Sequence, residues 1–200
     1  MITLFIDTST DTLTVSIIND DVILDEITLP SSEHSKYAMS AIESIFDKNN
    51  IKRNSVNKIM VVNGPGSFTG IRIGVTIAKI YAWACNINIV PISTLKAYAI
   101  SNMSYKYYIS SIDARRNYVY AAIYDSNYNN ILDESYINKD DLINKIIKLE
   151  DYLIISNTPI SEFNTVKPKL DIKRIYDYYK NDYHNYLLNF YTDEGLKLAG

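Results

Sequence analysis

The order in which apolar patterns follow one another constrains the fold of this chain more than any other feature. Apolar runs or strict alternation predict a meander of three short strands, at residues 2–6, 13–17 and 22–27. Helical spacing then alternates with apolar runs, which predicts helices at 33–48, 71–85 and 94–100 and strands at 58–63 and 87–92. The resulting order, βββαβαβα, predicts an α/β fold for the first half of the chain.

A second series of strand-like segments begins after Met103. Strand patterns at residues 107–112, 117–124 and 131–137 are followed by a predicted helix at 140–149 and a strand at 152–155. Residues 159–172 contain two prolines and no period, and a polar, tyrosine-rich helix is predicted at 176–191. Because the meander restarts between Tyr98 and Tyr107, we expect two lobes, residues 1–102 and 103–200.

Composition limits the class of protein and its partners. Of the 200 residues, 47% are apolar and 22% charged, which is typical of a folded globular protein. The net charge of −3 disfavours an autonomous tRNA-binding or DNA-binding module. Cys85 is the only cysteine, which excludes an internal disulfide and any CxxC motif. Arg72 and Lys79 interrupt the longest apolar stretch and no secretory signal precedes Asp7, so we expect a cytoplasmic protein with no membrane partner.

A glycine-bearing loop, Gly64–Gly70, lies between a predicted strand and a predicted helix, where backbone amides can bind an anion. Its spacing fits neither a Walker A loop nor a dinucleotide-binding GxGxxG sequence. The turn after the first predicted strand adds a carboxylate and a hydroxyl that can hold a metal-bound phosphate. Ordinary turns at both places are the alternative that we keep open. The candidate phosphate or nucleotide contacts are Asp7, Ser9, Gly64, Gly66, Ser67 and Thr69.

The two histidines do not suggest a metal site or a catalytic base. A pair of ligands at helical spacing would need a second ligand four residues after His34, and that position is Ala38. His184 has only Asp177 and Asp182 as acidic neighbours that could orient it. We therefore predict no catalytic residue and no metal ligand in this chain.

The first two long helices have apolar faces wider than one sheet contact requires. In the second, Arg72, Thr76, Lys79 and Trp83 form a narrow strip, and the remaining apolar arc spans about 220°. A small-residue ridge, which includes Gly70 and Gly74, divides that arc. Either a partner protein covers the excess, or the two helices simply pack on each other and on the sheet. The predicted partner surface comprises His34, Tyr37, Met39, Ile42, Phe46, Gly70, Ile73, Gly74, Ile77 and Tyr81.

Four segments together resemble the bacterial TsaB family: FIDTS at 5–9, His34-Ser35, VVNGPGSFTGIRIG at 61–74 and IDARRNYVY at 112–120. The resemblance covers about residues 1–125 and fades beyond Asn130, and the Pro-x-Tyr segment of many members is absent near the terminus. It implies the two-lobed actin/hexokinase-like (ASKHA) α/β fold, with lobes of βββαβα type. A reduced second lobe is expected.

The same resemblance implies a role in making threonylcarbamoyladenosine at position 37 of tRNAs that read codons beginning with A. TsaB proteins are the non-catalytic partners of the homologous catalytic subunit TsaD and work with the ATPase TsaE. The histidine pair of TsaD has no counterpart here. The resemblance therefore implies a scaffold that pairs with a TsaD-like subunit and a TsaE-like ATPase, forms a homodimer when alone, and meets tRNA only through the complex. No cofactor is expected to be required, and ATP or ADP at the partner interface stays open.

Two other classes of function are kept as alternatives. The first is an enzyme, either a kinase of the same superfamily or a metallopeptidase. A kinase of this type needs a late Gly-Gly loop for adenosine, whereas only Gly195 and Gly200 follow Gly74. The second alternative is a free-standing tRNA-binding module, which the acidic charge balance disfavours.

Overall fold

The computed structural model describes residues 1–30, 34–160 and 163–182. The contacts divide the chain into two compact units. The first unit contains Met1–Ile92 together with the chain from Tyr179 onward, and the second contains Ser93–Tyr178. Within the described residues, no helix is long and apolar enough to cross a membrane.

The first unit is built on a five-stranded sheet with the strand order β3-β2-β1-β4-β5. β1 pairs with β2 in antiparallel and with β4 in parallel orientation, as expected for a meander followed by a crossover. The predicted meander is therefore confirmed. The strands are β1 (Ile2–Asp7), β2 (Thr12–Asn19), β3 (Val22–Pro30), β4 (Val56–Gly64) and β5 (Asn88–Ser93).

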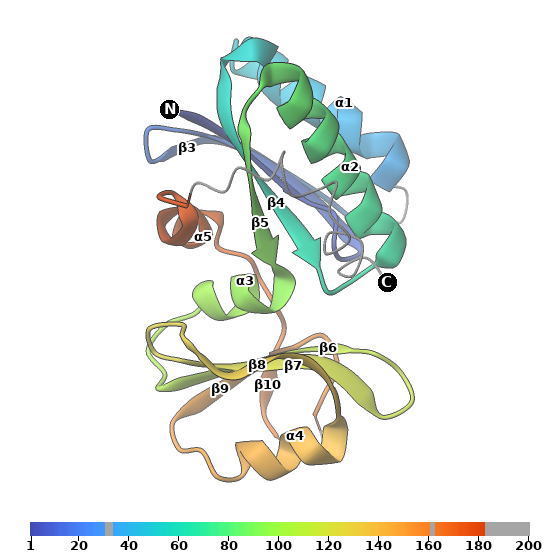
Figure 1. Cartoon of the computed structure of the whole chain (residues 1–200), viewed down its shortest axis with the longest axis vertical. Helices are drawn as coiled ribbons and strands as arrows, with labels where there is room; N and C mark the ends of the chain where they lie inside the picture. Colours follow the sequence, from blue (N-terminus) through green and yellow to red (C-terminus); the bar gives the residue numbers. More distant parts are fainter. Residues whose placement is uncertain (31–33, 161–162, 183–200) are drawn as a thin grey trace. The chain divides into compact units, whose positions relative to one another are not determined.

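Two helices, α1 (His34–Lys48) and α2 (Phe68–Cys85), lie next to each other on one face of this sheet (Figure 1). Alternate residues of the strands, such as Leu4 and Ile6 of β1, are buried beneath them. A short 3-10 turn, Arg53–Ser55, leads into β4. α2 begins three residues before the expected start, because the Ser67 hydroxyl caps it by accepting a hydrogen bond from the Gly70 amide at 3.2 Å.

The second unit repeats this sheet topology with the order β10-β9-β6-β7-β8. Helix α4 covers one face of the sheet and α3 the other (Figure 1). The described residues between β9 and β10 contain no helix, and the expected reduction of this lobe stays a prediction. Its elements are α3 (Thr94–Ile100), β6 (Tyr107–Asp113), β7 (Tyr118–Asp125), β8 (Asn130–Asn138), α4 (Lys139–Ile146), β9 (Tyr152–Ser156), β10 (Thr165–Val166) and α5 (Ile172–Tyr179).

The contact-based boundary falls before α3, earlier than the boundary predicted after residue 102. The physical reason is that α3 packs on the second sheet, where Leu95 and Tyr98 lie in one buried cluster with Tyr108 and Tyr124. The division of the chain into functional lobes at 1–102 and 103–200 stays a prediction.

The helix predicted at 176–191 was placed too late. α5 begins at Ile172, because the Asp171 carboxylate accepts the Arg174 amide at 3.0 Å and so caps the first turn. Ile172, Ile175 and Tyr176 are buried at helical spacing. Because residues 159–172 contain two prolines and no apolar period, the sequence pattern predicted neither this helix start nor the two-residue strand β10. The part of the predicted helix beyond residue 182 lies outside the described residues.

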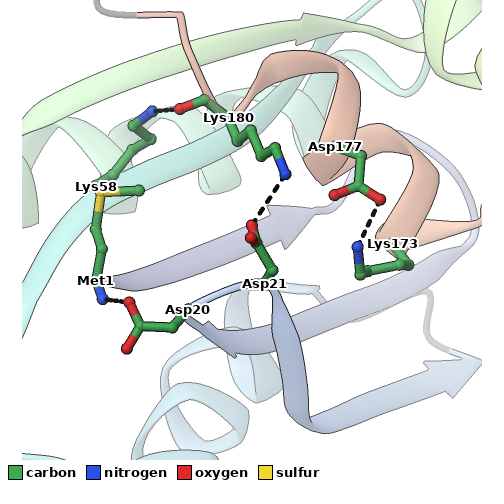
Figure 2. Close-up of polar contacts among 7 residues, drawn as sticks. All are labelled: Met1, Asp20, Asp21, Lys58, Lys173, Asp177 and Lys180. Atoms are coloured by element: carbon green, nitrogen blue, oxygen red, sulfur yellow. Dashed lines mark hydrogen bonds and ion pairs between the residues drawn. The ribbon is translucent and has the colours of Figure 1, made fainter.

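After α5 the chain returns to the first unit and covers a buried lysine. The Lys58 ammonium on β4 donates a hydrogen bond to the carbonyl oxygen of Lys180 at 2.6 Å (Figure 2). It donates a second one to the carbonyl oxygen of Asp182 at 3.1 Å. Lys180 in turn pairs with Asp21 at 3.2 Å. Burial lowers the pKa of Lys58, and the nearby Asp182 carboxylate partly opposes that shift. Residues 180–182 therefore form a strap, defined here by these three contacts.

Candidate functional site

The glycine loop is held against the turn that follows β1. The Ser67 amide donates to the Ser9 carbonyl at 2.7 Å, and the Thr8 hydroxyl donates to the Gly70 carbonyl at 2.7 Å. These two hydrogen bonds join segments about sixty positions apart in the sequence. The loop and the turn therefore form one structural unit, which we call the loop–turn junction.

Two glycines, Gly66 in the loop and Gly74 in α2, are needed for this close approach. A Cβ atom on Gly66 would lie 2.2 Å from the Ser9 carbonyl oxygen, which is backbone and has little freedom to move. A Cβ atom on Gly74 would lie 2.4 Å from the Thr8 hydroxyl oxygen. The glycines thus serve packing between α2, its loop, β1 and the turn that follows β1.

The structure brings several of the candidate phosphate contacts together at this junction. Asp7 is buried, and its carboxylate accepts the Ser9 amide at 2.8 Å. The buried Ser9 hydroxyl has no hydrogen-bond partner among the described residues. Gly66, Ser67 and Thr69 are exposed, whereas Gly64 is buried in the end of β4. A role for these six residues in binding phosphate or nucleotide stays a prediction, and the Ser67 amide is already used within the protein.

The predicted partner surface on α1 is only partly exposed. Tyr37 and Met39 have exposed fractions of 38% and 50%. Ile42 and Phe46, by contrast, are buried in the core beneath the helix, so the assignment of their side chains to a partner surface is corrected. His34 is the first residue of α1, and its side chain lies outside the description.

On α2 the small-residue ridge faces the sheet. Gly70, Gly74, Ala78 and Ala82 are its buried residues, so Gly70 and Gly74 cannot present a surface to a partner and their assignment is also corrected. The larger residues Ile73, Ile77 and Tyr81 are half-buried at the edge of the core. The physical reason is that small residues let the helix axis approach the strands closely, with bulky flanks on either side.

The outward face of α2 carries large apolar side chains that the sequence analysis did not select. Phe68, Ile80 and Trp83 have exposed fractions of 60%, 62% and 76%. The Arg72 guanidinium lies over the Phe68 ring, 3.8 Å from its centroid. The four-residue spacing of Phe68 and Arg72 was a signal for this contact. We define the outer helix face as Tyr37, Met39, Phe68, Ile80 and Trp83.

The two helices also contact each other, as the alternative interpretation proposed. The Phe46 and Tyr81 rings pack edge to face with centroids 6.2 Å apart, and the Tyr81 hydroxyl donates to the Arg53 carbonyl. Burial, with a smaller effect of Cys85, raises the pKa of Tyr81 to about 12. Contact between the helices therefore accounts for part of each wide apolar arc, and the outer helix face is what remains exposed.

The chemistry of the described residues includes no group of three or more His, Cys, Asp or Glu side chains placed to hold a metal ion. The acidic residue of the loop–turn junction, Asp7, holds a backbone amide. The loop–turn junction therefore holds backbone segments in place, and the outer helix face presents apolar side chains.

A family model described as TsaD, tRNA N6-adenosine threonylcarbamoyltransferase, matches residues 26–177. Proteins named tRNA threonylcarbamoyladenosine biosynthesis protein TsaB are similar to this chain. The protein from Bacillus subtilis is 40% identical over 62% of this chain, and that from Escherichia coli is 31% identical over 64%. These matches cover 55% and 57% of the relatives, so the matched part of the chain spans a little over half of their length.

Solved structures agree on the fold. YeaZ from Pseudomonas aeruginosa superposes with a TM-score of 0.70 over 88% of this chain and 90% of that chain, at 18% identity. Together with the repeated sheet topology, this likeness shows the expected α/β fold with two related units, and its assignment to the actin/hexokinase (ASKHA) type stays what the resemblance implies. The predicted resemblance is confirmed, and the chain belongs to the TsaD family and, within it, to the TsaB proteins.

Proposed function

We propose that this chain is a non-catalytic subunit required for threonylcarbamoyl transfer to adenosine 37 of tRNAs that read codons beginning with A. The names of its relatives support the process, since they are described as tRNA threonylcarbamoyladenosine biosynthesis proteins. A TsaD-like subunit supplies catalysis, a TsaE-like ATPase works with the pair, and tRNA binds to the assembled complex.

The observation that carries the proposal is the outer helix face. Five large side chains, two of them more than three-fifths exposed, lie on two adjacent helices of one unit. Exposed apolar side chains grouped in this way are typical of protein interfaces, in which aromatic residues and methionine are enriched. We assign this face to the TsaD-like subunit, and to a second copy of the chain when that subunit is missing.

The loop–turn junction supports a scaffold role as well. Its two hydrogen bonds, one from the Thr8 hydroxyl and one from the Ser67 amide, hold the turn after β1 against the start of α2, and they therefore fix the position of the helix that carries most of the outer face. An ASKHA-type kinase or a metallopeptidase-like enzyme is the alternative. The test incubates the chain alone with ATP, with peptides, or with the threonylcarbamoyl donor and tRNA. A kinase or peptidase would act on ATP or peptides alone. For the proposed function, we expect transfer to tRNA only when the TsaD-like subunit is added.

The test of the interface places one charge on each helix. Met39→Asp and Ile80→Asp would each bury an unpaired carboxylate on association, and we expect at least a hundredfold weaker pairing, from a cost of about 3 kcal/mol. Leu24→Asp is the matched control, because Leu24 is an exposed apolar residue of β3, 44% exposed and outside the face. Pairing is measured by gel filtration with and without the TsaD-like subunit, and folding by circular dichroism.

The contradicting result is equally clear. A folded Met39→Asp and Ile80→Asp double variant that still pairs and still supports threonylcarbamoyl transfer would place the interface elsewhere. Ile73→Asp is unsuitable for this test, because Ile73 packs against the core and the charge is expected to destabilise the fold.

A further inference from the structure

A cluster of tyrosines on the second sheet has no role in the proposed interface. The Tyr118 and Tyr136 rings are stacked, with centroids 4.6 Å apart and an angle of 4° between the planes. Tyr120 lies against Tyr136 at 5.5 Å. Tyr120 and Tyr136 remain 42% and 55% exposed. We call these three residues the tyrosine surface.

Strand register explains why the three rings share one face. Tyr120 pairs with Tyr136 across β7 and β8. Val119 and Ala121, which alternate with the tyrosines on β7, are buried in the core with Leu142 of α4. The tyrosines therefore point to the other face of the sheet, the one that α3 covers further along β7. At this end of the face, the described residues leave two of the rings exposed.

The loop before Tyr118 presents two arginines in an unusual backbone conformation. Arg115, Arg116 and Asn117 have φ angles of 66°, 52° and 64°, a run of three left-handed residues without glycine. Such a conformation costs free energy and persists only where surrounding contacts impose it. Those contacts are backbone hydrogen bonds, from the Tyr118 amide to the Arg115 carbonyl at 3.0 Å and from the Lys139 amide to the Asn117 carbonyl at 2.9 Å.

Two nearby carboxylates, Asp113 and Glu134, already have partners, whereas these arginines have none among the described residues. Asp113 pairs with Lys139 at 3.0 Å, and Glu134 accepts the Tyr124 hydroxyl at 2.9 Å. Arg115 and Arg116 are exposed, and their side chains make no ion pair or hydrogen bond with the residues that the structure describes. Two uncompensated guanidinium groups therefore lie two and three positions before the stacked rings.

We propose that the tyrosine surface and these two arginines bind single-stranded RNA, with an unpaired base stacked on the rings and its phosphates held by Arg115 and Arg116. Aromatic side chains on neighbouring strands, flanked by cations, suit RNA bases that are free of a duplex. The inference deepens the proposed function, since it assigns the RNA contact of this subunit. The net charge of −3 limits the contact to this patch and makes the binding weak and dependent on salt.

The test uses the full chain and a fluorescein-labelled single-stranded RNA decamer, with binding followed by anisotropy at several salt concentrations. Tyr120→Ala and Tyr136→Ala are each expected to weaken binding about tenfold, whereas Tyr120→Phe and Tyr136→Phe preserve it, because stacking needs the ring. Arg115→Ala and Arg116→Ala are each expected to reduce the slope of log affinity against log salt by about 0.7. Circular dichroism verifies that each variant is folded.

Matched controls are available within the chain. Tyr105→Ala removes another partly exposed tyrosine of the same unit, and Arg53→Ala removes an arginine that pairs with Glu43. Both are expected to leave RNA binding unchanged. Three results would each overturn the inference. The first is an equal loss of binding in the controls, and the second is no saturable binding by the unchanged chain at low salt. The third is unaltered binding by the alanine variants.

A protein partner is the competing occupant. If the tyrosine variants keep RNA binding but lose pairing with the TsaD-like subunit in gel filtration, the surface binds protein and the RNA inference is wrong. The decamer assay requires neither the TsaD-like subunit nor threonylcarbamoyl transfer. A failure of the proposed function, seen as transfer that does not depend on this chain, is therefore distinguishable from a failure of the RNA contact.

Discussion

The two sheets have the same strand order but are covered differently. Taken from the outer meander strand, the orders are β3-β2-β1-β4-β5 and β8-β7-β6-β9-β10. In the first unit the face holding Leu4 and Ile6 lies under helices of 15 and 18 residues. In the second, the described residues place one helix on the corresponding face, the 8-residue α4, and Ile160 and Phe163 after β9 also pack into that core.

This difference shows that the topology of a lobe does not require one particular helical cover. A sheet face needs apolar volume packed against it, and a segment without helical structure supplies that volume as long as its side chains are apolar. What a long helix adds is a second face. α2 contacts the sheet through small residues and presents Phe68, Ile80 and Trp83 outward. The second unit instead exposes tyrosines on the sheet itself.

The largest expected effect is on the loop–turn junction, which has no counterpart among the described residues of the second unit. Gly66→Ala would place a methyl group 2.2 Å from the Ser9 carbonyl oxygen. We expect the free energy of unfolding to fall by about 3 kcal/mol or more, measured by urea denaturation. Thr69→Ala, at an exposed neighbouring position, serves as the control. An unchanged midpoint for Gly66→Ala would remove the packing role of this glycine.

The second prediction compares the two cores directly. Ile45 on α1 and Ile146 on α4 are both fully buried, in separate clusters. Replacement of either by alanine is expected to cost about 2 to 4 kcal/mol in its own unit. Trp83 is the only tryptophan and lies in the first unit, so its fluorescence transition should shift for Ile45→Ala and much less for Ile146→Ala. Equal shifts would mean that the two units unfold as one.

The third prediction concerns the strap, in which residues 180–182 contact the first unit. Truncation after Tyr179 removes the two carbonyl groups that accept from the buried Lys58 ammonium. We expect a loss of about 1 to 3 kcal/mol, because a buried charged donor is left with fewer partners. Lys58→Met should make the truncation less costly by about 1 kcal/mol or more, and this coupling is obtained from a double-mutant cycle. If the effects of the truncation and of Lys58→Met on the free energy of unfolding were additive, the strap would stabilise the fold independently of Lys58.

The smallest effect is on two carboxylates, one in each unit. The Lys48 ammonium, at 2.7 Å, and the Asn49 amide lower the pKa of Asp25 below its ordinary value of 3.8. The side-chain and backbone amides of Asn129 lower the pKa of Asp125 in the same direction. A lowered pKa in the folded state means that each group stabilises the fold above its unfolded pKa. That contribution is lost as pH falls through the folded pKa.

The two carboxylates should differ in their response to salt. Added salt is expected to raise the pKa of Asp25 towards its ordinary value and to change that of Asp125 less, because only the first has a charged principal partner. Lys48→Ala should abolish the salt response of Asp25. Titration of both groups by NMR measures this, and identical salt responses would contradict the distinction.

Local patterns in the sequence were sufficient to predict most of the elements. The three strands of each meander, the helix that begins at His34 and the short helix Thr94–Ile100 agree with the structure to within a few residues. Period-two and period-3.6 spacing of apolar residues arises from the geometry of one strand or one helix, so it is present in the sequence without knowledge of any neighbour. The four segments at 5–9, 34–35, 61–74 and 112–120 together were sufficient to predict the family.

Only the tertiary structure decided which part of each wide apolar arc faces inward. In α2, Gly74 faces the sheet and Ile80 faces outward, although isoleucine is the more apolar residue. α2 packs so close to the sheet that only small residues fit between them. How close it lies depends on Thr8 and β1, which are far from Gly74 in the sequence. The placement of α3 in the second unit and the return of residues 180–182 to Lys58 likewise depend on contacts between distant segments, which leave no local period in the sequence.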